Sequence, residues 1–244
     1  MAGIIDQVST SVEALTQEFE IITHNLANVS TVGYKRRCNA FSKLLDVQPG
    51  GIETYSPGSV ELNWVLDFSQ GSVVETGRPL DVALYGKGFF VIETPEGPLY
   101  TRNGIFLKNQ NGQIVDSQGR IVSGEAGPIT IPNNVGISQL NISSDGNISA
   151  DGTVIGKFRL VDFPDDESKL APAGENCYRM PDATILPVAA GNIVVKQGYQ
   201  EASNVKLIDE LVDMIMVARL YEANMNSLTA QQEASSSLMS VAAG

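Results

Sequence analysis

Residues suited to acid–base or metal chemistry are scarce in this sequence. The chain of 244 residues has one histidine, His24, and two cysteines, Cys38 and Cys177. A single histidine rules out two-histidine metal motifs, and two distant cysteines form no CxxC motif and indicate small buried side chains better than a disulfide. His24 could be a catalytic base or a pH sensor. We favour a polar residue at a helix end, because a lone base without an activated nucleophile makes no catalytic arrangement.

The stretch 162–167 is the other candidate for chemistry. It carries four carboxylates, those of Asp162, Asp165, Asp166 and Glu167. They could bind a hard cation, but their spacing matches no EF-hand loop, and Pro164 favours a solvated turn. Asp162 and Glu167 could also be the carboxylate pair of an extracytoplasmic β-rich hydrolase, which is one alternative function. We predict no catalytic residue, no metal site and no cofactor.

The composition is that of a folded, acidic protein. Hydrophobic residues make up 43% of the chain and charged residues 18%, which is typical of globular proteins. The formal net charge of −12 argues against nucleic acid or an anionic membrane as a partner. No apolar run approaches the ~20 residues of a membrane span, so we predict no membrane insertion. The opening MAGIIDQVST lacks the basic and apolar regions of a cleaved secretory signal.

The N-terminal region has a helical pattern. Its apolar residues recur at alternating intervals of three and four, which predicts a heptad helix of about 25 residues. This first seam consists of Ile5, Val8, Val12, Leu15, Phe19, Ile22, Leu26 and Val29. Gly33 could end the helix in a left-handed conformation. Residues 35–37 (KRR) would then place positive charge near the helix C-terminus, where the helix dipole favours it.

The C-terminal region repeats this pattern. A second seam consists of Leu207, Leu211, Met214, Ala218, Tyr221, Met225 and Leu228. A neighbouring apolar stripe broadens the face of the first half, and Ser203 or Asn204 is the expected N-cap. After Leu228 the residues are mostly small or polar, so this end of the helix buries little surface by itself.

Between the two helices the pattern changes to that of strands. In 59–68 (SVELNWVLDF) apolar and polar residues alternate, and this predicts a half-buried strand. Further short apolar runs follow every eight to twelve residues: 89–92, 105–107, 114–115, 121–122, 129–131, 140–142, 154–163 and 193–195. Turn signals such as Asp145-Gly146 and Asp151-Gly152 separate several of them. This spacing predicts an antiparallel β domain.

Neither helix is expected to be stable by itself. Burial of one apolar seam does not offset the cost of ordering a long backbone segment, so an isolated helix or a single pair is marginal. Neighbours on several sides would stabilise such helices, and this is the situation inside a polymer.

Several sequence blocks resemble those of the bacterial flagellar rod and hook proteins. Residues 24–35 (HNLANVSTVGYK) are similar to the N-terminal signature of that family, and residues 203–224 are similar to its C-terminal signature. Four middle blocks follow in the family's order: DFSQG at 67–71, TGRPLD at 76–81, GKGFF at 86–90 and YTRNG at 100–104. The hook protein has an additional outer domain that 244 residues cannot accommodate, so the resemblance is to a rod subunit.

The resemblance implies an α+β fold. Long N- and C-terminal helices would pair as a coiled-coil layer, with a central antiparallel β-rich domain between them in the sequence. Residues 1–45 would be the N-terminal helical arm of the axial core, and residues 200–244 the C-terminal arm that pairs with it. The β-rich middle region would span residues 46–199, with an outer domain at roughly 76–185.

The resemblance also implies a function and partners. The chain would be a structural subunit of the flagellar basal-body rod, not an enzyme, and would polymerise helically into the hollow shaft that transmits motor torque through the periplasm. Its partners would be copies of itself, other flagellar rod and hook proteins, and the flagellar type III export apparatus, which passes its substrates without a cleaved signal. A secreted or surface-exposed rod-like protein or adhesin is the alternative beside the hydrolase.

Residues of both terminal regions are expected at the assembly interface. Asn25 and Asn28, one helical turn apart, could hydrogen-bond to a neighbouring backbone and fix the register. Each predicted residue could equally pack within its own subunit. The predicted set is Leu15, Phe19, Ile22, Asn25, Leu26, Asn28, Gly33, Tyr34, Asn204, Leu211, Met214 and Tyr221.

Overall fold

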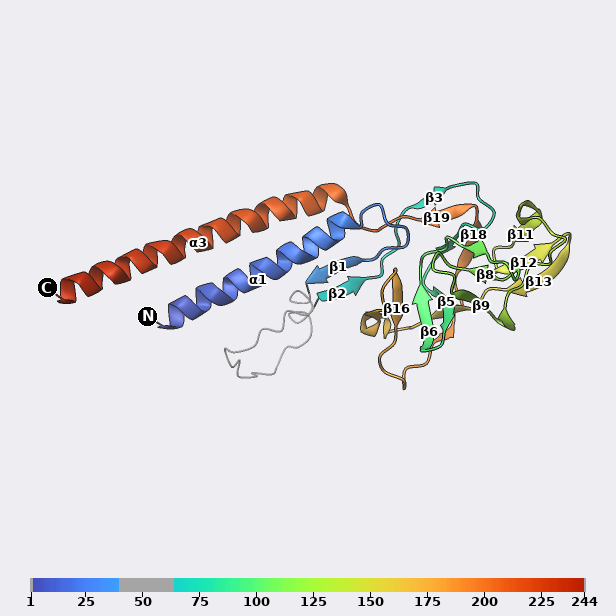
Figure 1. The fold of residues 1–244 in the computed structure, drawn as a ribbon, viewed down its shortest axis with the longest axis horizontal. Coiled ribbons are helices and arrows are strands. Elements are labelled where there is room, and N and C mark those ends of the chain that lie inside the picture. Colours follow the sequence, from blue (N-terminus) through green and yellow to red (C-terminus); the bar gives the residue numbers. More distant parts are fainter. Residues whose placement is uncertain (1, 40–63, 244) are drawn as a thin grey trace. The chain divides into compact units, whose positions relative to one another are not determined.

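The computed structural model describes residues 2–39 and 64–243, which divide into two compact units (Figure 1). The described residues of the helical unit lie in 2–27, 37–39, 64–66 and 206–243. Those of the β unit lie in 28–36 and 67–205. Each unit therefore combines segments that are separated in the sequence. The predicted boundary at residues 45 and 46, and the predicted strand positions 59–63, lie outside the described residues.

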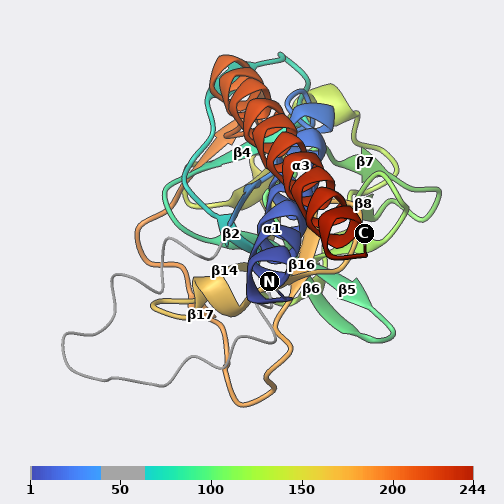
Figure 2. The ribbon, with the colours of Figure 1, turned by 90° about the vertical axis from the view of Figure 1, so that its left-hand side faces the viewer.

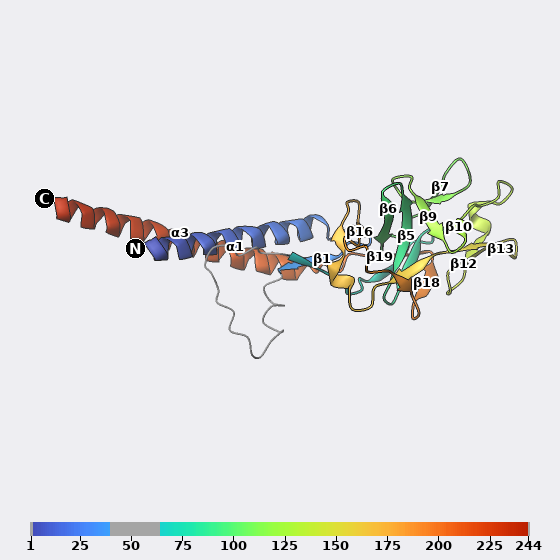
Figure 3. The ribbon, with the colours of Figure 1, turned by 90° about the horizontal axis from the view of Figure 1, so that it is seen from below.

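The helical unit contains α1 (Ala2–Ala27) and α3 (Leu207–Ala243). The two helices run antiparallel and side by side, as Figures 1, 2 and 3 show from three directions. In the same unit, β1 (Arg36–Asn39) pairs with β2 (Trp64–Asp67). No helix within the described ranges has a stretch both long and apolar enough to cross a membrane.

The predicted coiled-coil layer is wrong, although the α+β class is confirmed. Coiled-coil packing requires both seams to be buried against each other, but Phe19 of α1 is 43% exposed and Leu211 and Tyr221 of α3 are 44% and 41% exposed. Among the described side chains of α3, Glu210 and Val217 alone are buried. The apolar residues of α3 lie around much of its circumference, so one neighbouring helix covers a small part of them.

The β unit consists of short strands joined by turns. Its largest sheet contains ten strands among the described residues. The strands of the unit are β3 (Val73–Glu75), β4 (Val82–Tyr85), β5 (Phe89–Thr94), β6 (Gly97–Thr101), β7 (Leu107–Lys108), β8 (Ile114–Val115), β9 (Ile121–Gly124), β10 (Gly127–Pro128), β11 (Leu140–Ile142), β12 (Asn147–Ala150), β13 (Thr153–Lys157), β14 (Leu160–Asp162), β15 (Ala171–Pro172), β16 (Cys177–Arg179), β17 (Val188–Ala189), β18 (Val194–Gln197) and β19 (Tyr199–Glu201). Two short 3₁₀ helices, η1 (Ile137–Gln139) and η2 (Glu167–Lys169), complete it.

All strand pairs with a described register are antiparallel, which confirms the predicted β-rich centre. The largest sheet runs in the order β15-β16-β6-β5-β9-β8-β7, and β14 also pairs with β5. Strands β11, β12 and β13 form a separate antiparallel sheet. Late strands return to early ones, since β18 pairs with β4 and β19 pairs with β3. These two pairings attach the segment before α3 to strands more than 100 residues earlier.

One core fills the β unit. Phe90 contacts Phe106 and Phe158 edge-to-face, with ring centroids 5.0 and 5.4 Å apart, and all three side chains are fully buried. Aliphatic residues of several strands surround these rings. The predicted strand at 154–163 is interrupted at Phe158, because β13 pairs with β12 whereas β14 pairs with β5.

Candidate functional site

Three predicted interface residues line an apolar groove in the helical unit. Leu15 and Phe19 of α1 and Tyr221 of α3 contribute to it, together with Thr16, Val217 and Ala218. The groove has a volume of about 330 Å³. Near it in sequence, Leu26 and Met214 are half-buried, Leu211 is exposed and Ile22 is buried. The predicted apolar residues of the helices therefore differ in exposure, and the exposed ones are accessible to a neighbouring subunit.

Asn25 is buried and its amide is used within the helical unit. Its Nδ2 donates to the carbonyl of Arg37 at 2.9 Å and to Oε2 of Glu210 at 3.2 Å, while its Oδ1 accepts from the Arg37 N–H at 2.9 Å. The Arg37 guanidinium lies over the Trp64 ring, 4.2 Å from its centroid. Asn25 thus ties α1 to the start of both β1 and α3.

Asn28 belongs to the β unit, where its Oδ1 accepts a hydrogen bond from the Thr31 hydroxyl at 3.2 Å. The two asparagines predicted to act together are therefore placed in different units, since α1 ends at Ala27. A helix continued to Val29 would have put them on one face. Because the chain turns at residues 28–31, the two side chains do not share a helix face.

Gly33 and Tyr34 occupy a tightly packed turn of the β unit. Gly33 has a φ of +71°, and its N–H donates to the carbonyl of Glu201 at 2.7 Å. A Cβ atom at this position would lie 2.6 Å from the backbone nitrogen of Asn103. Tyr34 is 5% exposed. Both residues therefore fix the path of the chain within the subunit.

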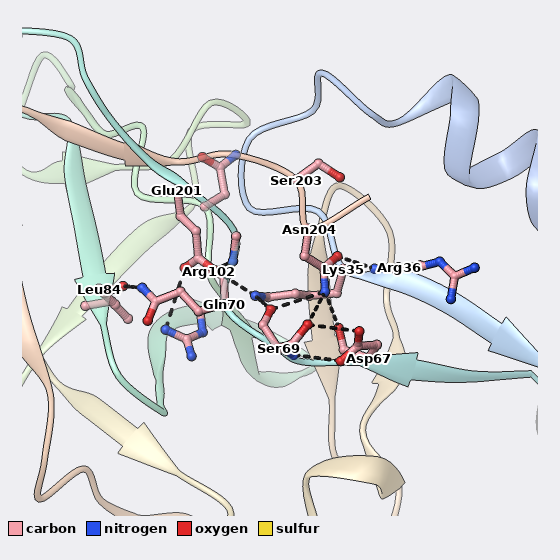
Figure 4. A network of polar contacts seen from close by, with 12 residues as sticks. Lys35, Arg36, Asp67, Ser69, Gln70, Leu84, Arg102, Glu201, Ser203 and Asn204 are labelled. Atoms are coloured by element: carbon pink, nitrogen blue, oxygen red, sulfur yellow. Dashed lines mark hydrogen bonds and ion pairs between the residues drawn. The ribbon is translucent and has the colours of Figure 1, made fainter. Parts of the chain in front are cut away.

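Asn204 joins three segments of the β unit. Its Oδ1 accepts from the Arg36 N–H at 2.7 Å, and its Nδ2 donates to the carbonyls of Asp67 at 2.8 Å and Ser69 at 3.2 Å (Figure 4). Helix α3 begins at Leu207, so the expected N-cap at Ser203 or Asn204 is wrong. The Asn204 side chain satisfies backbone groups far along the chain in place of the first turn of the helix.

A buried ionic network lies next to Asn204. The Lys35 ammonium donates to Oε1 of Glu201 and to the carbonyl of Ser69, both at 2.7 Å. Nη1 of Arg102 lies 3.6 Å from Oε2 of Glu201, and its Nη2 donates to the carbonyl of Gly86 at 2.7 Å (Figure 4). The side chains of Lys35, Arg102 and Glu201 are at most 1% exposed. We call these three residues the ionic cluster.

Burial dominates the electrostatics of the ionic cluster. It lowers the pKa of Lys35 and that of Arg102, because a charged group loses its hydration, and the Glu201 carboxylate offsets part of each shift. One carboxylate thus faces two buried cations. Lys35 does not serve as a charge at the end of α1, as its position in the sequence led us to expect. It forms a specific buried pair.

Sequence reasoning missed the ionic cluster. Lys35 and Arg102 both stand in blocks that carry the family resemblance, but these blocks are largely polar and do not mark either cation as buried. Glu201 lies outside those blocks, and no local pattern points to it. The Gln70 side chain was also missed: it donates to the Leu84 carbonyl at 2.7 Å and accepts from the Gly86 N–H at 3.0 Å.

The residues considered for chemistry lie on separate elements: His24 on α1, Asp162 on β14 and Glu167 on η2. Partial burial and the nearby Arg37 charge lower the pKa of His24, which lies on α1. Burial raises the pKa of Glu167 on η2. Within residues 2–39 and 64–243, no group of three His, Cys, Asp or Glu side chains is arranged to hold a metal ion.

Two family models match this chain. Residues 83–150 match the flagellar hook protein FlgE/F/G D1 domain, and residues 196–241 match the flagellar basal body rod FlgEFG protein C-terminal region. The first match covers strands of the β unit, from β4 to β12. The second covers the end of β18, all of β19 and most of α3.

Full-length relatives extend the similarity. The chain is 34% identical to the flagellar basal-body rod protein FlgG of Buchnera aphidicola subsp. Acyrthosiphon pisum, over 92% of this chain and 94% of the relative. It is 32% identical to FlgG of Agrobacterium fabrum, over 93% and 95%, and 32% identical to the rod protein FlgF of Caulobacter vibrioides, over 86% and 85%.

The chain belongs to the flagellar basal-body rod protein family. This confirms the resemblance found in the sequence blocks. The rod protein is a structural subunit of the flagellar basal body and not an enzyme, so the hydrolase hypothesis based on Asp162 and Glu167 is wrong. The candidate site has a structural role. The ionic cluster and Asn204 hold the segments with which the chain enters and leaves the β unit.

Proposed function

We propose that the rod protein polymerises helically with copies of itself and with other flagellar rod and hook proteins. The resulting hollow shaft transmits motor torque across the periplasm. Export through the flagellar type III apparatus, which the family resemblance implies, is part of this proposal. Residues 1–45 and 200–244 supply the axial core of the polymer, and residues 46–199, with roughly 76–185 as an outer domain, supply the rest of each subunit.

The exposed apolar surface of α3 carries this proposal. Ile208 is 75% exposed, and other large apolar side chains of the helix are between 38% and 57% exposed. Soluble monomers rarely leave so continuous an apolar surface in water. Covering it by neighbouring subunits would remove it from water and stabilise α3. The residues concerned are Leu207, Ile208, Leu211, Val212, Ile215, Met216, Leu220, Tyr221 and Met225.

The predicted interface residues divide into two roles under this proposal. The exposed residues Phe19, Leu211 and Tyr221 contact neighbouring subunits. The buried members act through positioning, because their side chains are already used inside the subunit: Ile22, Asn25, Gly33 and Tyr34. Leu15, Leu26, Asn28, Met214 and Asn204 are half-buried and can contribute to both roles.

Ile215→Glu tests this function, because Ile215 is 55% exposed on α3. The variant is expected to fold as the wild type does, since the new carboxylate can stay in water in a monomer. In a polymer the same charge would be buried without a partner, so recovery in purified basal bodies should fall by about tenfold or more. Motility should fall with it.

Ile215→Val is the matched control, since it keeps the site apolar and leaves the charge unchanged. It should assemble as the wild type does. Thermal unfolding of all three purified proteins checks that the folds are equal. Normal incorporation of the folded Ile215→Glu protein would show that this face of α3 is not covered in the rod.

A further inference from the structure

The β unit contains a cleft that takes no part in the proposed contacts of α3. A cleft of about 1160 Å³ opens between the first half of β6 and the segment 179–187. The residues of the ionic cluster do not line it. Leu99, Met180, Ile185 and Leu186 provide apolar surface, and Leu186 is 76% exposed. One wall of the cleft is therefore apolar.

Three arginines line this cleft: Arg120, Arg159 and Arg179. The Arg120 guanidinium pairs with Asp116 at 2.7 Å. Arg159 and Arg179 are exposed, and neither side chain forms an ion pair or hydrogen bond with any residue in the described part of the chain. Two acidic residues also line the cleft, Glu96, which is exposed, and Asp182. The Oδ1 of Asp182 accepts from the N–H and hydroxyl of Thr184 at 2.9 and 2.7 Å. The cleft thus offers two unpaired guanidinium groups beside apolar side chains.

The turn between β12 and β13 has the complementary chemistry. Val154, the second residue of β13, is 64% exposed, which exceeds the exposure of every other large apolar residue of the β unit except Leu186. Asp151, in the turn itself, is exposed, has a φ of +49° and forms no ion pair or side-chain hydrogen bond among the described residues. Figure 1 shows this hairpin at the periphery of the β unit. It combines a free carboxylate with an apolar side chain on a narrow projection.

We propose that the cleft of one rod-protein copy binds the β12–β13 turn of a second copy. The Asp151 carboxylate then pairs with Arg159 and Arg179, and Val154 packs against the apolar side of the cleft. The two surfaces differ, so the contact is head-to-tail and repeats from copy to copy, as a helical polymer requires. A chain with a net charge of −12 repels its own copies, and pairing of the two guanidinium groups with a neighbour's carboxylate counters this repulsion. This contact rests on the proposed function and adds a second interface to it.

Charge exchange across the contact tests the proposal in the full-length chain. The variants are Arg159→Glu with Arg179→Glu, Asp151→Lys, and all three substitutions together. Each is produced in place of the wild-type rod protein, and its amount in purified basal bodies is measured. The control, Lys108→Glu with Lys196→Glu, makes the same change in net charge outside the cleft.

Each partial variant is expected to reduce incorporation by about tenfold or more, because like charges then face each other. The triple variant restores the attraction with reversed sign and should recover most of the loss. The control should incorporate normally. All substituted side chains of the contact are exposed, so equal thermal unfolding of the purified variants is expected and separates assembly from folding.

Normal incorporation of Arg159→Glu with Arg179→Glu would overturn the proposal. A loss that Asp151→Lys does not repair would also overturn it, because the cleft would then receive another partner. In both cases the wild type is still present in basal bodies, and the proposed function stands. Absence of the wild-type chain from basal bodies would contradict the proposed function itself.

Discussion

The ionic cluster concentrates opposing charges at one point of the β unit. Glu201 is shared between Lys35 at 2.7 Å and Arg102 at 3.6 Å, and all three are excluded from water. A buried pair adds little net stability relative to an apolar one, but removal of one partner leaves an unpaired charge in the interior. Loss of the single Glu201 carboxylate would leave two unpaired buried cations, those of Lys35 and Arg102.

Glu201→Gln should therefore lower the free energy of unfolding by about 3–5 kcal/mol. The substitution keeps the size of the side chain and removes its charge, so packing changes little. Chemical denaturation followed by circular dichroism measures the effect. The matched control is Glu125→Gln, which breaks an exposed pair with Lys157 that has the same 2.7 Å separation. It should change stability by about 1 kcal/mol or less, and equal effects at both sites would refute the importance of burial.

Glu167 leads to a prediction about pH. Burial raises the pKa of this carboxyl above its usual 4.5, so the folded state holds the proton more tightly than the unfolded state. Its contribution to stability is present below pH 4.5 and is lost as the pH rises through the raised pKa. Glu167→Gln keeps the neutral form at all pH values.

The Glu167→Gln protein should accordingly be more stable than the wild type at neutral pH. The difference should vanish well below pH 4.5, where both side chains are uncharged. Denaturation at a series of pH values tests this. A variant that is less stable at neutral pH would show that the carboxylate is held by its cationic neighbours Lys87 and Arg102 more strongly than burial disfavours it.

At the scale of elements, the segment 28–36 depends on one turn. Gly33 places the chain so that its own N–H reaches Glu201 while the backbone passes close to Asn103. Its left-handed φ is open to glycine, and the close approach admits no side chain. The left-handed conformation of Gly33 and its close approach to Asn103 are therefore coupled to the ionic cluster, because the Gly33 N–H binds the backbone of Glu201.

Gly33→Ala and Gly77→Ala separate these effects. Both glycines have a φ of +71°, but a Cβ at Gly77 meets nothing within 4 Å. Gly77→Ala should cost about 1–2 kcal/mol of unfolding free energy for the backbone conformation. Gly33→Ala should cost about 1–3 kcal/mol more, because it also crowds Asn103. Equal losses in parallel denaturation curves would mean that the backbone at Asn103 moves aside freely.

At the scale of the whole molecule, two compact units carry different shares of stability. The β unit encloses a continuous apolar core, whereas α3 buries few of its described side chains. Burial protects backbone hydrogen bonds from opening, so regions without it open readily. The subunit before assembly should therefore be ordered in its β unit and labile in α3.

Hydrogen exchange on the full chain should show this difference. In dilute subunits, amides of residues 211–230 should exchange much faster than those of β5 and β9. After assembly into the rod, protection of 211–230 should rise strongly while that of the β strands changes little. Strong protection of α3 in the dilute monomer would contradict the view that its partners are other subunits.

The sequence alone identified the family, the α+β class and about half of the described strands. Ordered blocks such as 24–35 and 100–104 carry the family resemblance, and short apolar runs between turn residues predict strands through local backbone preference. The terminal helices follow from their spacing of three and four. These signals work because each reflects interactions between residues close in the chain.

Only the tertiary structure shows which helix faces are buried and which residues the buried polar side chains contact. Heptad spacing describes one face of one helix, and it cannot show that the apolar residues of α3 stay exposed or that Asn25 binds Glu210 across 185 positions. Nor can it show that Lys35 pairs with Glu201, 166 positions away, or that Asn204 binds the backbone of Asp67 instead of capping α3. The energy of such contacts depends on the distance and burial of groups that only the folded chain brings together.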